Sequence, residues 1–221
     1  MILAAGLGAV AGVDRTAFAQ TMLAHPVVCG TLSGWMAGDP ESGLRLGLVF
    51  GMLASRRAPI GGEGPVVDWT SAAIAVPFAL GRSAAGWQWG LGLAAGLVLA
   101  LLGGHVIRAV RALAARREAR AEQAALLGDL GAIERIHLGF LGLHLLRGAA
   151  MTILGAGLIG ALAFDLRWSG PEQSAASMIW GFAPLVAATV LVDSHRRVAG
   201  WKMVGFGALM GLTLVLWVVV L

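Results

Sequence analysis

Charged residues are scarce in this chain, and the shortage limits the kind of protein it can be. Asp, Glu, Lys and Arg make up 13% of the 221 residues, whereas 58% are hydrophobic and the mean hydropathy is +0.81. A soluble domain carries about a quarter of charged residues because its surface must face water. We therefore predict an integral membrane protein. The 33 glycines suit this class, since small residues let membrane helices pack closely.

Cysteine and the common catalytic motifs are also lacking. Cys29 is the single cysteine, so neither an internal disulfide nor a cysteine-based metal site can form, and a role as a buried small hydrophobe is favoured. The chain has no Walker loop, no GxSxG or HExxH motif and no Cys/His metal spacing. We expect no cofactor, no metal and no catalytic residue. The first 13 residues lack the basic start of a signal peptide, so we expect them in the mature fold.

Positive charge is concentrated in one place. The net charge of +4 comes from 15 Arg and one Lys against 12 acids, and many of the bases lie in residues 108–135, between apolar segments. The tendency of Lys and Arg to stay in the cytoplasm explains this position more simply than nucleic-acid binding does. We therefore place residues 108–135 in the cytoplasm and expect no nucleic-acid partner.

The first 82 residues contain only short or interrupted apolar segments. Those segments are residues 2–13, 17–37, 42–55 and 69–81, and the second and fourth contain Pro26 and Pro77. Short membrane segments broken by Gly or Pro indicate discontinuous or re-entrant helices around a binding site. Such backbone is tolerated at membrane depth only where it is buried in protein or lines a watery cavity.

From residue 83 onward the apolar segments reach the length of membrane spans. We expect one span in residues 83–107, a charged amphipathic cytoplasmic segment in 108–135, and three spans in 136–221. In the first of these three spans we expect four glycines to act as packing notches: Gly139, Gly142, Gly155 and Gly160. The predicted fold is a single all-α polytopic membrane domain, with broken N-terminal helices followed by about four full transmembrane spans. The orientation of the N-terminus stays open.

Three polar residues in or beside the N-terminal segments are candidates for contact with a hydroxyl-rich molecule: Gln20, Glu63 and Asp68. The amide of Gln20 suits sugar hydroxyls, but a buried amide also commonly ties two helices together. Asp39 lies in "GDPESG", which favours a solvated turn followed by a helix with Pro40 at its first position. Arg45 in that helix is within i, i+4 reach of Glu41.

The stretch "RRAPIGGEGPVVDW", residues 56–69, is the most irregular of the chain. Its loop-shaping residues are Pro59, Gly61, Gly62, Gly64 and Pro65. Glycine permits unusual backbone, which exposes N–H and C=O groups beside the carboxylates of Glu63 and Asp68 and the face of Trp69. This mixture favours a hydroxyl-rich ligand. An ordinary extramembrane loop fits the two leading arginines equally well.

Two other polar positions border the first segments. Asp14 and Arg15 are either an intramembrane pair or the interfacial end of a helix, and the sequence does not decide between these. His25 precedes Pro26, where a helix is expected to be interrupted. A local cap is therefore favoured over a proton carrier.

His137 and His144 lie seven residues apart on one helical face, with Arg147 one turn further on. A catalytic or phosphorylated histidine is one interpretation of this pattern. No acid lies within a turn of His144, so we favour two histidines that face a polar seam between helices.

The ordered series "DRTAFAQTMLAHPVVCGTLSGWMAGDPESGLRLG…APIGGEGPVVD" resembles the IIC component of mannose/fructose/sorbose-type sugar phosphotransferase systems (PTS). The shared pattern is an early Asp, a Gln, a Pro opening "VxGTLxGxxxGD", then "PIGG" and an Asp. It covers residues 1 to about 80 and continues more weakly through "IHLGFLGLHLLRGA".

The resemblance implies a multi-pass protein of the bacterial cytoplasmic (inner) membrane. Such proteins pair with a IID subunit, in a higher oligomer, to carry a hexose or amino sugar by an elevator-like movement of a core domain. In a protein of this kind, we expect Gln20, Asp39, Glu63 and Asp68 near the sugar path. A cytoplasmic IIB subunit phosphorylates the sugar, supplied through enzyme I, HPr and IIA. IIC itself is not phosphorylated and is a non-catalytic transport subunit.

Two departures from the family pattern concern carboxylates. The family usually has a glutamate where this chain has Gly51, and Glu63 stands where the family usually has none. The chain is also shorter than typical. We hypothesise that Glu63 compensates for the missing glutamate. The alternative function is a degenerate regulatory or scaffolding IIC that docks PTS components with little sugar flux.

Overall fold

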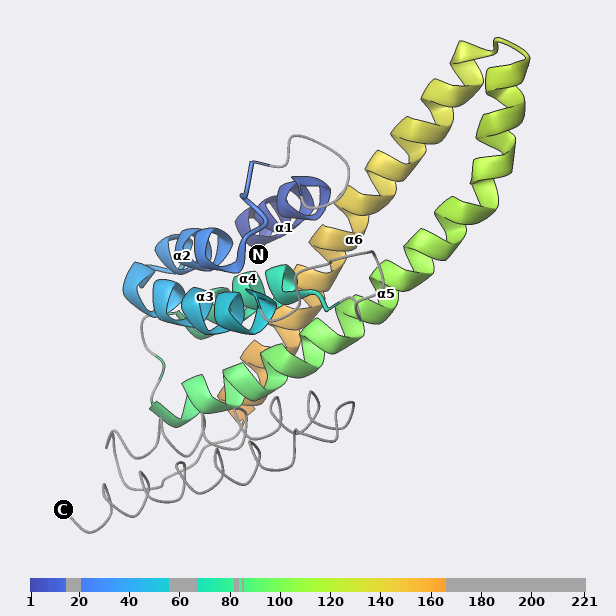
Figure 1. Ribbon diagram of the computed structural model, residues 1–221. Coiled ribbons are helices and arrows are strands. Elements are labelled where there is room, and N and C mark those ends of the chain that lie inside the picture. The colour runs from blue at the N-terminus through green and yellow to red at the C-terminus, as the bar shows by residue number, and fades with distance from the viewer. Residues whose placement is uncertain (15–20, 56–66, 82–83, 85, 166–221) are drawn as a thin grey trace, which may run out of the picture.

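The computed structural model (Figure 1) describes residues 1–14, 21–55, 67–81, 84 and 86–165. Within these ranges the chain forms six helices and no strand: α1 (Ile2–Asp14), α2 (Pro26–Met36), α3 (Pro40–Ser55), α4 (Trp69–Leu80), α5 (Gly86–Leu126) and α6 (Leu130–Asp165). Helices α5 and α6 are long and apolar enough to cross a membrane. The prediction of an all-α polytopic membrane protein is confirmed. The spans expected after residue 165 lie outside the described residues.

The first four helices are short. They contain 13, 11, 16 and 12 residues, which at 1.5 Å per residue makes them about 16–24 Å long. The hydrocarbon core of a bilayer is about 30 Å thick, so none of them crosses it alone. The predicted broken helices of the N-terminal third are confirmed. In Figure 1 they gather against one half of a long hairpin formed by α5 and α6.

The starts of these helices follow the local sequence signals. His25 is the N-cap of α2, its side chain accepts a hydrogen bond from the Val27 backbone N–H, and Pro26 occupies the first turn. The favoured interpretation of His25 as a cap is confirmed. Asp39 Oδ1 accepts from the Ser42 N–H at 3.0 Å at the start of α3, and α3 begins at Pro40 as predicted.

Helix α4 is the centre of the fold. Every residue from Trp69 to Pro77 is buried, which explains why its sequence is apolar or small all round. Helix α2 lies parallel to it: Cys29 Sγ contacts the carbonyl oxygen of Thr70 at 3.8 Å, and one turn later Ser33 Oγ donates to the carbonyl of Ile74 at 2.6 Å. Cys29 is fully buried, as favoured from the sequence.

Glycines let backbones touch at two helix pairs. Between α2 and α3, a Cβ added at Gly34 would lie 2.7 Å from the Cα of Gly43. Between α1 and α6, a Cβ at Gly148 would meet the carbonyl of Gly8. Of the four glycines expected to be packing notches, Gly155 packs against Leu99 and Ala75. At the other three, Gly139, Gly142 and Gly160, an added Cβ would meet no atom of the described residues within 4 Å, so the expectation for them stays a prediction.

The hairpin runs from the apolar to the charged part of the sequence without interruption. Helices α5 and α6 contain 41 and 36 residues and are joined by a turn in which Gly128 has φ +71°. The boundary expected at residue 107 therefore falls inside one continuous helix. We call residues 108–138 the arm. Its two helices meet along buried Val110 and Ala124, and the Arg117 guanidinium lies 5.7 Å from the Phe140 ring centre.

Candidate functional site

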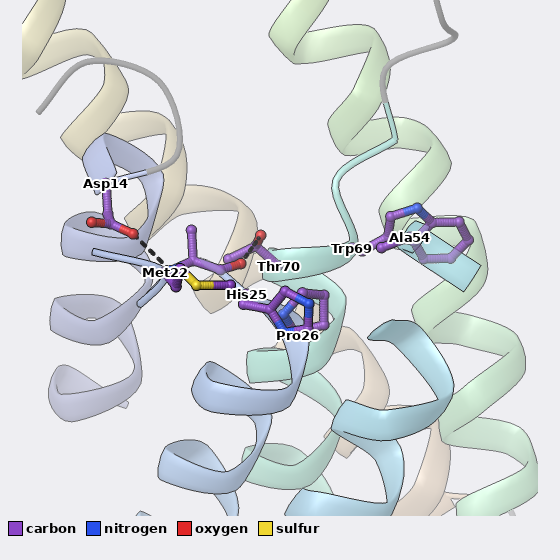
Figure 2. Close-up of a pocket in the computed structure, with 8 residues that line it drawn as sticks. Asp14, Met22, His25, Pro26, Ala54, Trp69 and Thr70 are labelled. Atoms are coloured by element: carbon purple, nitrogen blue, oxygen red, sulfur yellow. Dashed lines mark hydrogen bonds between the residues drawn. The ribbon is translucent and has the colours of Figure 1, made fainter. Parts of the chain in front are cut away.

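A pocket of about 400 Å³ lies where the end of α1, the beginning of α2, the end of α3 and the beginning of α4 meet (Figure 2). Its lining residues are Asp14, Met22, Ala24, His25, Pro26, Ala54, Trp69 and Thr70. Pockets for small molecules commonly have volumes of roughly 300–1,000 Å³, with apolar walls and a few polar groups. The composition of this lining follows that pattern.

Asp14 fixes the shape of one wall. Its side chain is buried and accepts hydrogen bonds from the Thr21 N–H at 2.6 Å, the Thr21 hydroxyl at 2.8 Å and the Ala24 N–H at 3.0 Å. Between these anchors Met22 adopts φ +67°, which is uncommon for a residue other than glycine. Strained backbone of this kind is found mostly at binding and switch sites. The structure thus shows Asp14 as a helix end that organises the pocket; Arg15 lies outside the described residues.

The opposite wall is made by α2 and α4. His25 Nδ1 accepts from the Val27 N–H at 3.3 Å, so a neutral His25 carries its proton on Nε2. The Thr70 hydroxyl donates to the Ala24 carbonyl at 2.8 Å. Trp69 supplies an aromatic face, and its ring lies 6.1 Å from that of Phe50. In Figure 2 the ring of Trp69 lies beside Ala54 and across from His25.

Asp68 directly precedes Trp69 of this wall, but its side chain is buried and bonded to other side chains of the protein. Its side chain is 1% exposed, caps α4 and accepts from the Ser71 hydroxyl at 2.8 Å. Its Oδ2 also accepts from Nη1 of Arg147 on α6 at 2.7 Å, and Nη2 of Arg147 donates to the Gly12 carbonyl at 3.4 Å. The buried ion pair therefore joins α4, α6 and α1.

Of the other predicted site residues, Asp39 lies away from the pocket, and Gln20 and Glu63 are not described by the structure. Asp39 is separated from the pocket by the whole length of α2, since the pocket lies at Pro26 and Asp39 follows the other end of the helix. The structure does not bring Asp39 and Asp68 together. Gln20 and Glu63 lie outside the described residues, as do the loop-shaping positions Pro59, Gly61, Gly62, Gly64 and Pro65.

Arg147 and the pocket residues Asp14 and Thr70 were not among the predicted site residues. A signal for Arg147 was present, because a charged residue within "HLLRGAAM" is costly at membrane depth and is expected to have a partner. The sequence does not name that partner, which lies 79 residues away.

Position 51 lies next to the pocket. A Cβ added at Gly51 would be 3.0 Å from Val27 Cγ2 and 3.5 Å from His25 Cε1. Gly51 precedes the lining residue Ala54 by one turn of α3. The glycine therefore has a packing reason of its own, and a longer side chain here would extend toward His25.

The pocket lies at the end of the short helices that faces the arm. Helix α1 is antiparallel to α6: Gly8 lies against Gly148, and Gly12, further along α1, lies against His144, earlier in α6. The Asp14 end of α1 therefore points toward the beginning of α6, which belongs to the arm.

The contacts between α4 and α5 also place the pocket end of the short helices toward the arm. Asp68, at its start, lies against Gly103 of α5, whereas Leu80, at its end, lies against Gly92. The start of α4, which lines the pocket, thus points along α5 toward the charged residues that begin at Arg108. Two independent helix pairs place the pocket and the arm on one side.

Comparison with known proteins agrees with this architecture. A family model described as the "PTS system sorbose-specific IIC component" matches residues 1–166. No match was found among curated protein sequences. A solved structure titled "Structure of membrane protein" has a TM-score of 0.61 and 24% identity, over 96% of this chain and 78% of that one, and so supports the fold. The resemblance seen in the sequence is confirmed: the chain belongs to the mannose/sorbose-type IIC family of the phosphotransferase system, as a membrane subunit for sugar transport that works with other components of that system.

Proposed function

We propose that this chain, together with a IID subunit, forms the path by which a hexose or amino sugar crosses the bacterial cytoplasmic membrane. A cytoplasmic IIB subunit, supplied through enzyme I, HPr and IIA, then phosphorylates the sugar. The observation that carries this proposal is the pocket on the side of the basic arm. Because Lys and Arg remain in the cytoplasm, a sugar held in this pocket faces the compartment that contains the phosphoryl donor.

The pocket offers chemistry suited to a sugar. The Trp69 face can stack on the apolar C–H side of a pyranose ring, while His25 and Thr70 provide polar groups for hydroxyls. Two of the predicted residues are close in the sequence to residues that form this pocket. Gln20 directly precedes Thr21, which is bonded to Asp14. Glu63 belongs to the segment between Ala54 and Trp69, both of which line the pocket.

We therefore assign the predicted site residues different roles. Gln20 and Glu63 are proposed to contact the sugar. Asp68 is proposed to support the pocket from behind through its ion pair, and Asp39 to hold the start of α3 at the end of the short helices remote from the pocket. The scaffolding alternative differs from this proposal in flux, which an uptake experiment measures directly.

Transport is tested in a strain that lacks its own mannose system and expresses this chain with its cognate IID and IIB. We expect phosphorylated product from at least one labelled hexose or amino sugar, and none without IIB. If every sugar tested gives no phosphorylated product while all three proteins are present in the cell, the transport proposal is wrong and the scaffolding alternative stands.

Replacing Glu63 with alanine is expected to reduce sugar uptake. A hydrogen bond to a charged group contributes about 1.5–3 kcal/mol, equivalent to a loss of roughly tenfold to a hundredfold in kcat/KM. The matched control is Glu41→Ala, because Glu41 is exposed and lies at the opposite end of α3. Normal uptake by the Glu63→Ala variant would remove Glu63 from the sugar path.

A further inference from the structure

We propose that the arm is the docking site for the cytoplasmic subunit that donates the phosphoryl group, and that a basic helix and an apolar tip hold this subunit. The inference rests on the proposed function, because it assumes that a soluble donor must reach the pocket. It adds a location and a chemistry for that contact.

The arm extends well beyond the pocket. From Gly103, at the level of the pocket, to Leu126 at the end of α5 there are 23 residues, or about 35 Å of helix. From Leu130 to His144 on α6 the distance is about 21 Å. Figure 1 shows the outer half of the hairpin continuing past the four short helices instead of folding back over them.

The tip of the arm exposes large apolar side chains. Leu126, Leu127 and Leu130 are 82%, 84% and 77% exposed, and all three lie within one turn of the hairpin end. The last apolar stretch of α5 ends at Ile107, so Leu126 is about 28 Å further along the helix. Leucines grouped this far from the hydrocarbon are in water, where an apolar cluster indicates a protein contact.

Arginines lie beside this cluster. Arg116 and Arg120 are exposed and share one face of α5, being four residues apart. Arg117, in contrast, lies over the Phe140 ring and contributes to the contact between α5 and α6. The complementary surface is an apolar patch bordered by Asp and Glu. Opposite charges of this kind raise association rates and orient the partner.

The dimensions fit a small soluble domain. A domain of about 100 residues has a radius of gyration of about 13 Å, and hence a diameter of about 30–35 Å. This is comparable to the height of the arm above the pocket, about 35 Å along α5 and about 21 Å along α6. A domain resting against the arm would cover the pocket opening and could bring its phosphohistidine to a bound sugar. A lipid surface is a poorer occupant, because the tip continues the direction of the spanning helices and leaves the bilayer behind.

The test uses the full chain with IID in lipid nanodiscs and the purified cognate IIB. Two variants address the two parts of the surface: Arg116→Glu with Arg120→Glu, and Leu126→Gln with Leu127→Gln. We expect each to weaken IIB binding at least tenfold, and the wild-type affinity to fall with added salt. Equilibrium binding of labelled sugar without IIB should not change, and the KM for IIB in the phosphorylation assay should rise while kcat is retained.

Arg45→Gln is the matched control, since it removes an exposed arginine near the start of α3, remote from the pocket and the arm, and should leave IIB binding unchanged. Equal IIB affinity of wild type and both variants overturns the proposal, as does a loss of sugar binding or a change of oligomeric state in them. If the wild type neither binds nor phosphorylates sugar but the variants still lose IIB, the docking proposal stands and the transport proposal fails. If sugar phosphorylation is intact but both variants bind IIB with the wild-type affinity, the transport proposal stands and the docking proposal fails.

Discussion

Replacement of Arg147 with methionine is expected to destabilise the folded protein by about 3–5 kcal/mol, because it leaves the carboxylate of Asp68 buried without its charged partner. Asp68 and Arg147 are 1% and 3% exposed at their side chains, so water cannot replace the lost contact. The same change also removes the hydrogen bond to the Gly12 carbonyl. Unfolding measured in detergent or nanodiscs, by heat or by denaturant, gives the difference in free energy.

Two further variants isolate the role of the ion pair. Combining Arg147→Met with Asp68→Asn removes both charges and is expected to recover a large part of the stability. Arg45→Met breaks the exposed pair with Glu41 and should change stability little. If Arg147→Met were as harmless as Arg45→Met, the ion pair would not be holding α4, α6 and α1 together.

Replacement of Gly148 with alanine is expected to lower stability by about 1–3 kcal/mol, the cost of overpacking a filled interior. The added methyl group would meet the backbone of Gly8 and lie 3.2 Å from the Cα of Gly12, and neither backbone can move without displacing α1. The displacement would reach Asp14 at the end of α1, so the pocket should be altered as well.

Gly142→Ala on the same helix is the control. Its added methyl group would meet no described atom within 4 Å, and alanine in a helix interior is more favourable than glycine by about 0.5–1 kcal/mol. The two variants are therefore expected to shift thermal unfolding in opposite directions. Equal shifts would mean that the contact between α1 and α6 is looser than the structure shows.

Much of the fold follows from local sequence signals. Proline and histidine positions predict the starts of α2 and α3, and the shortage of charge predicts the membrane class. The limit of such signals appears at residue 107, where composition changes but helix α5 does not end. Composition reports the solvent around a residue, whereas a helix can pass from lipid into water while keeping its backbone conformation.

The candidate site was harder to predict for a different reason. Asp68 and Arg147 meet across 79 residues, and no local pattern tells which acid faces which base. The same holds for glycines: Gly139 and Gly148 look alike in the sequence, but only Gly148 lies on the side of α6 that α1 approaches. Asp39 and Asp68 were grouped by chemistry, yet the parallel arrangement of α2 and α4 places them at opposite ends of the helices.

The shortness of α1 to α4 also has a consequence for the bilayer. Exposed apolar side chains on these helices, such as Ile2, Leu3 and Trp35, face their surroundings over a height of only about 16–24 Å, whereas α5 and α6 are long enough for the full hydrocarbon thickness. One protein thus presents two hydrophobic thicknesses to its lipids. Such a mismatch is relieved by local thinning of the membrane or by another membrane protein covering the short side, so the thickness of the host membrane becomes a variable in how this subunit folds and assembles.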